Sequence, residues 1–217
     1  QGRLDTRSEA YGIELRCDSF PLNRFLPADS LGLIDLALQA GGSGFDPLRA
    51  QPRGNIRLQV DRAEFRGRDF GGVELNANLE GGQLSGRLSD RDEALRLLLL
   101  VSGTLTERKQ EFRLTGNVFD FDLAELGISP QKIGGSFALE AGASASDAGS
   151  YTARIALDSI EVRTRHRTDR IRPTSLSLSS DTTATRARLA SGDLSLAFVS
   201  PGPVDSLVPA LTRSADI

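Results

Sequence analysis

The sequence predicts an all-β protein built as an antiparallel meander. Three observations support this fold class. Apolar and polar residues alternate with a period of two in most segments, and Gly-rich or polar turns separate these segments. The helical period of 3.6 residues occurs clearly only near the carboxyl end. About ten strands are expected at spacings of roughly 10 to 20 residues, which is typical of all-β chains.

The first half of the chain predicts two successive hairpins. Apolar residues alternate with charged or amide residues, so one side of each strand is expected to be buried and the other wet. The turn 80–83 contains two adjacent glycines, which adopt positive φ at no steric cost and therefore favour a tight hairpin. The predicted strands cover 54–61, 73–79, 84–88, 95–101 and 112–118.

The second half repeats this scheme after a soft boundary at 127–130. Strands are predicted over 137–141, 151–157, 176–178 and 194–198. We interpret 1–128 and 129–217 as two consecutive meander slices of one continuous sheet. Helix is limited to short turns at 21–26 and 123–126, and to a short terminal helix that begins at Pro203.

One predicted strand is apolar on both faces. Leu98 and Leu100 point to the side opposite Leu97 and Leu99, because successive side chains of a strand alternate. We therefore expect both sides of this strand to be covered, either by the terminal helix or by the 21–26 turn.

Composition and charge exclude several classes of protein. The net charge of -3 argues against a nucleic-acid surface, which needs an excess of basic residues. One Cys and one His cannot build a disulfide framework or a Cys/His metal cluster, and no cofactor is indicated. No catalytic residues stand out, so we expect a non-enzymatic protein. The chain does not begin with Met and carries no signal-like start, so we expect a piece of a longer protein.

Two stretches resemble the TamB and AsmA-like periplasmic proteins, in particular the TamB-type translocation and assembly module proteins of Bacteroidetes. The first stretch runs through 63–67, 73–79, 82–86 and 92–95 and ends at 121–127. The second covers 189–198 and continues at 205–207. Both consist of strand-and-turn patterns, and together they extend over most of residues 50 to 217.

The resemblance implies a long β-sheet curled into a U-shaped, taco-like groove with an apolar interior. Such a protein would cross the periplasm from an inner-membrane anchor, carry phospholipid or another acyl lipid, and take part in envelope assembly with an outer-membrane barrel partner. The anchor and the barrel-docking region would lie outside this chain.

The candidate groove lining consists of the apolar residues that occupy one phase of each predicted strand. An acyl chain on such a face gains about 0.8 kcal/mol per buried methylene. The predicted lining is Ile56, Leu58, Val60, Val73, Leu75, Leu79, Leu84, Leu88, Leu95, Leu97, Leu99, Phe112, Leu114 and Val118.

Two alternatives remain open at this stage. The same alternation is typical of a closed β-sandwich, which would act as a binding module for a protein or carbohydrate partner. The chain has few of the aromatic side chains that carbohydrate-binding surfaces typically use, because it has no Trp and only Tyr11 and Tyr151 as tyrosines. Arg163, Arg165 and Arg167 belong to a basic cluster that is either a contact for anionic head groups or a solvated hairpin.

Overall fold

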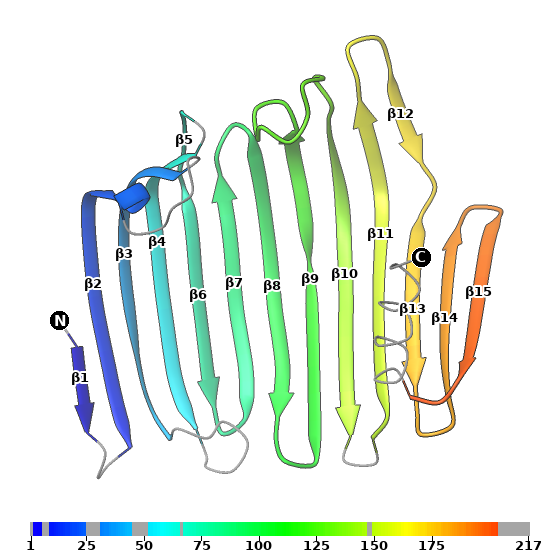
Figure 1. The fold of residues 1–217 in the computed structure, drawn as a ribbon, viewed down its shortest axis with the longest axis horizontal. Coiled ribbons are helices and arrows are strands. Elements are labelled where there is room, and N and C mark those ends of the chain that lie inside the picture. Colours follow the sequence, from blue (N-terminus) through cyan, green and yellow to red (C-terminus); the bar gives the residue numbers. More distant parts are fainter. Residues whose placement is uncertain are drawn as a thin grey trace.

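The computed structural model describes residues 2–5, 9–24, 31–44, 52–65, 67–146 and 149–203. They form one antiparallel sheet of fifteen strands whose order follows the chain (Figure 1). Strand β5 extends β4, and β12 extends β11, as short hairpins beside the main path. The strands are β1 (Gly2–Asp5), β2 (Ala10–Pro21), β3 (Leu31–Ser43), β4 (Arg53–Phe65), β5 (Arg68–Phe70), β6 (Val73–Glu80), β7 (Gln83–Arg91), β8 (Leu95–Leu105), β9 (Lys109–Asp122), β10 (Gly134–Ser146), β11 (Tyr151–Arg163), β12 (Thr168–Ile171), β13 (Thr174–Ser180), β14 (Ala184–Ser191) and β15 (Leu194–Pro201).

The predicted all-β meander is confirmed, but the expected number of about ten strands is too low. The strands without a counterpart in the prediction are β1–β3, β5, β12 and β14. The sheet continues without a break across the soft boundary at 127–130. There, β9 and β10 pair over their whole length, from Asp122 opposite Gly134 to Lys109 opposite Ser146.

The glycine pair at 81–82 forms the predicted hairpin turn between β6 and β7. Glu80 pairs with Gln83, and the two glycines have φ of 56° and 79°. Positive φ at both central residues is the geometry whose twist matches that of the flanking strands. Glycine is required there because other residues adopt this region at a steric cost.

Helix is scarce among the described residues, as predicted. A 3-10 turn, η1 (Leu22–Arg24), occupies part of the turn predicted at 21–26. Segment 123–126 forms the predicted turn, in which the Leu126 N–H donates to the Asp122 carbonyl at 2.9 Å. The helix predicted from Pro203 lies almost wholly outside the described residues. Within the described part of the chain, no helix has the length and apolar character needed to span a membrane.

The closed β-sandwich is wrong for the described residues, because all their strands belong to a single sheet. The apolar side chains found buried among them are few: Pro52, Ala94, Val118 and Ala184. The accessible surface is 14761 Å². A compact protein of 23.3 kDa exposes about 9,700 Å², so this sheet has faces that a second layer does not cover.

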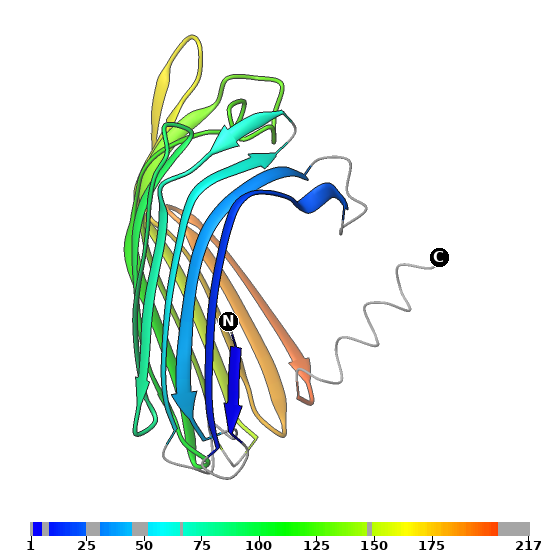
Figure 2. The same ribbon diagram turned by 90° about the vertical axis from the view of Figure 1, so that its left-hand side faces the viewer.

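The sheet is curled. Figure 2 shows the upper ends of β2, β3 and β4 bending toward one side, while the lower ends of β13–β15 swing to the same side. The strands therefore enclose an open trough instead of a barrel or a two-layered core.

Candidate functional site

A row of leucines crosses the sheet from β2 to β11. Directly opposed residues of antiparallel strands share one face, so the strand register places all members of this row on the same side. At the usual strand spacing the row is roughly 38 Å long. Gly116 of β9 is the position without a side chain. We call this the leucine row; its members are Leu15, Leu38, Leu58, Leu75, Leu88, Leu99, Leu139 and Leu157.

The register places every residue of the predicted lining on the face that carries the leucine row. Val60 lies opposite Val73, Leu79 opposite Leu84, and Leu97 opposite Val118. Most of these side chains are half-buried by their neighbours in the sheet. Ile56 and Phe112 keep 45% and 37% of their surface exposed, because nothing among the described residues lies over them.

The apolar face covers more strands than the groove lining predicted from the sequence. It extends over β2 and β3 on one side and over β10–β15 on the other, where Leu196 and Phe198 are 56% and 53% exposed. Period-two alternation in 11–17, 34–40 and 187–189 was the signal that could have identified part of this extension. The added residues include Tyr11, Ile13, Cys17, Leu36, Ile155, Leu176, Leu178, Leu189, Leu194, Leu196 and Phe198.

The apolar face is the concave side of the sheet. The Gly81 N–H donates to the Pro52 carbonyl, so Pro52 directs its carbonyl toward β6. Every second residue of a strand hydrogen-bonds to the same neighbour, so Gly54, Ile56 and Leu58 also direct their N–H and C=O groups toward β6. Strand β4 runs upward in Figure 1 with β6 on its right, and an L-residue in that orientation points its side chain at the viewer. Figure 2 shows that the sheet curls toward this same side.

The convex face is mainly polar among the described residues but carries an apolar patch on β8. Leu98 and Leu100 point to this side, as predicted from alternation, but the expected cover is not found among the described residues. Leu100 is 48% exposed. Together with Ala138, Ala156 and Ala190, these leucines line a shallow hollow of about 730 Å³.

Asp90 is an acidic residue on the concave face, opposite Leu97. Partial burial among apolar neighbours raises the pKa of its carboxyl group, and a hydrogen bond from the Asp92 N–H at 2.9 Å partly opposes this shift. Because the folded-state pKa is above the unfolded one, Asp90 disfavours folding once the pH rises through that raised value.

Replacing Asp90 by Asn should therefore stabilise the protein at pH 7. The amide keeps an oxygen to accept the Asp92 hydrogen bond and carries no charge to desolvate. The free energy of unfolding from urea titrations is expected to be higher than wild type at pH 7 and equal to it near pH 3. A variant that is less stable than wild type at pH 7 would contradict this account.

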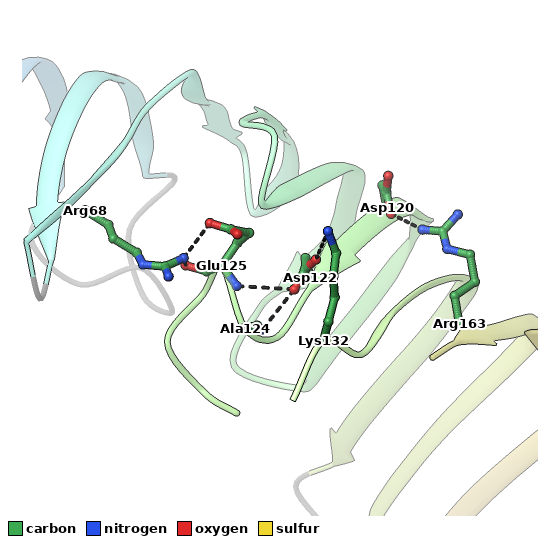
Figure 3. A network of polar contacts seen from close by, with 7 residues as sticks. All are labelled: Arg68, Asp120, Asp122, Ala124, Glu125, Lys132 and Arg163. Atoms are coloured by element: carbon green, nitrogen blue, oxygen red, sulfur yellow. Dashed lines mark hydrogen bonds and ion pairs between the residues drawn. The ribbon is translucent and has the colours of Figure 1, made fainter. Parts of the chain in front are cut away.

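The rim at the upper end of the trough is held by ion pairs between hairpins that are distant in sequence (Figure 3). Arg68 of β5 reaches the Glu125 carboxylate at 2.5 Å and its carbonyl at 2.9 Å. Asp122 accepts the Ala124 N–H at 2.9 Å and lies 3.9 Å from the Lys132 amine, so it caps the turn that follows β9. The Arg68 contacts connect the β4–β5 hairpin with the β9–β10 connection, and the Asp122 contacts hold that connection together.

The predicted basic cluster lies on the β11–β12 hairpin, and its arginines differ in their partners. Arg163 forms an ion pair with Asp120, and Arg167 lies 2.7 Å from Asp169. Arg165 is exposed and has no such partner among the described residues. Of the three candidate head-group contacts, Arg165 is therefore the one without an ion-pair partner among the described residues.

Comparison with protein families, curated proteins and solved structures finds no match to this chain. Within the described residues, no three His, Cys, Asp or Glu side chains are grouped so that they could hold a metal ion.

Proposed function

We propose that this protein is a non-enzymatic lipid conduit of the cell envelope, of the TamB and AsmA-like kind. Its concave face shields the acyl chains of phospholipids, or of other acyl lipids, as they pass through the periplasm between the inner and outer membranes. The observation that carries this proposal is the leucine row on a concave face that no other described residues cover.

Burial energetics support an acyl occupant. An exposed apolar surface of this extent is unfavourable in water and gains by contact with hydrocarbon. An acyl chain that buries roughly 10 methylenes gains on the order of 8 kcal/mol before ordering costs. That gain is sufficient to capture a single chain from water.

The leucine row also suits movement of the chain along the trough. Neighbouring positions of the row are nearly all the same residue, so a methylene that leaves one leucine meets another. No hydrogen bond has to break at each step, and the barriers to sliding remain small. The direction of net movement would come from outside this sheet.

We infer that the whole protein is held at the inner membrane by a segment outside this chain. Contact with an outer-membrane barrel partner would also use other regions. These two inferences rest on the family resemblance alone.

Lipid extraction tests the proposed function. The chain is expressed with periplasmic targeting, purified without detergent, and extracted with organic solvent for mass spectrometry. We expect phospholipid in amounts comparable to the protein. The matched control is a variant with Leu97→Asp and Leu99→Asp, which places charges at the centre of the concave face and should retain little lipid. Wild-type protein that is folded and free of lipid would overturn the proposal.

A further inference from the structure

The convex face carries a row of arginines near the lower ends of the last strands. Arg154 of β11 and Arg188 of β14 both lie opposite residues of β13 in the same cross-strand row, with Ser177 between them. At the usual strand spacing their Cα atoms are about 10 Å apart. Two guanidinium groups at this separation can converge on one anion placed over Ser177.

These two guanidinium groups are available to bind an anion. Both side chains are exposed, and neither makes an ion pair or side-chain hydrogen bond with the described residues. The neighbouring arginines differ in this respect, because Arg113 donates to Glu140 at 2.8 Å and Arg186 lies 3.6 Å from Asp181. The available positive charge is thus concentrated at Arg154 and Arg188.

The arginine row borders a shallow hollow of about 640 Å³. Its floor is formed by small residues such as Gly142, Ser177 and Ser179, so an anion can approach the sheet closely. The two carboxylates at its edge already have cationic partners. Glu140 pairs with Arg113, and Glu111 pairs with Lys109 at 2.5 Å.

A second hollow continues from the first. Arg154 and Glu140 line both hollows. The second contains the apolar patch of Leu98, Leu100 and Ala156 described above. A charged site and an apolar surface are therefore contiguous across the convex face.

We propose that this convex surface binds the phosphate group of a single-chain anionic lipid. The phosphate lies between Arg154 and Arg188, which offer paired N–H donors suited to its oxygens. The alkyl chain runs past Ala156 toward Leu100. This site is on the face opposite the leucine row, so it goes beyond the conduit proposed above and stands independently of it.

Titration calorimetry with dodecyl phosphate, below its micelle concentration, tests the site. We expect the combined Arg154→Gln and Arg188→Gln variant to bind about tenfold more weakly or worse, because two charge-assisted contacts are lost. Arg57→Gln is the matched control: Arg57 lies on the polar face of β4 and donates to Asn76 at 3.2 Å. This variant should bind as wild type does.

Two further measurements separate the alkyl half of the site from its phosphate half, and the whole site from the concave face. Leu100→Asp should weaken dodecyl phosphate binding and leave binding of inorganic phosphate unchanged. Leu114→Arg alters the opposite face. In this background, the Arg154→Gln and Arg188→Gln substitutions should still weaken dodecyl phosphate binding. The proposal is overturned if the double arginine variant binds like wild type, or if Arg57→Gln loses as much. Equal affinity for dodecyl phosphate and inorganic phosphate would refute the apolar half.

Discussion

A Leu114→Arg substitution is expected to block lipid passage while the sheet remains folded. Leu114 lies on the concave face between Val101 of β8 and Ala141 of β10. The long arginine side chain keeps its charge in water when the trough is empty, but a passing acyl chain must displace that water. Loss of contact with three or four methylenes costs about 3 kcal/mol, or roughly a hundredfold in affinity.

Arg113→Glu provides the control for this prediction. Arg113 precedes Leu114 in β9, is 66% exposed on the convex face and pairs with Glu140. Its replacement changes the charge by more than Leu114→Arg does, yet it should leave lipid passage intact. Both variants are compared in the native host for folded abundance and for resistance of the cells to detergent. Full activity of an abundant Leu114→Arg protein would mean that the apolar face has only a structural role.

Gly116→Ala is expected to destabilise the sheet by about 1–3 kcal/mol, the usual cost of overpacking. Gly116 lies between Leu99 and Leu139 in the leucine row. A Cβ atom there would meet the Leu98 carbonyl oxygen and come within 2.8 Å of Leu99 Cα. These are backbone atoms, so β8 and β9 would have to move apart.

Gly12→Ala is the matched control, because a Cβ at Gly12 of β2 has no atom within 4 Å. This substitution should be neutral or stabilise the protein by up to about 1 kcal/mol, since alanine has less conformational freedom in the unfolded chain. The free energies of unfolding of both variants are measured by urea titration. Equal stabilities would contradict the close approach of β8 and β9 at this point.

The lining of β4, β6, β7 and β9 could be predicted because apolar and polar residues alternate without interruption in the predicted part of each strand. Ile56, Leu58 and Val60 occupy one phase, and a register slip would expose all of them. The first strands were harder to recognise. The pairing of β2 with β3 shifts register after Cys17, and Ser19 has φ of 53°, so the apolar phase changes within the strand.

Other features depend on pairing between strands and could not be predicted from local pattern. A half-buried strand has the same alternation in a sandwich and in a single open sheet, so only the strand order distinguishes them. The arginine row has the same origin. Arg154 and Arg188 are distant in the sequence. They lie in one cross-strand row only because β11 and β14 both pair with β13.

Photo-crosslinking in cells shows directly which face of the sheet carries lipid. A photoreactive residue is placed at Phe112, on the concave face, and separately at Asn76, on the convex face of β6. A lipid adduct is expected from the Phe112 position and none from Asn76, at equal protein levels. Lipid capture at Asn76 with none at Phe112 would contradict the assignment of the concave face as the lipid path.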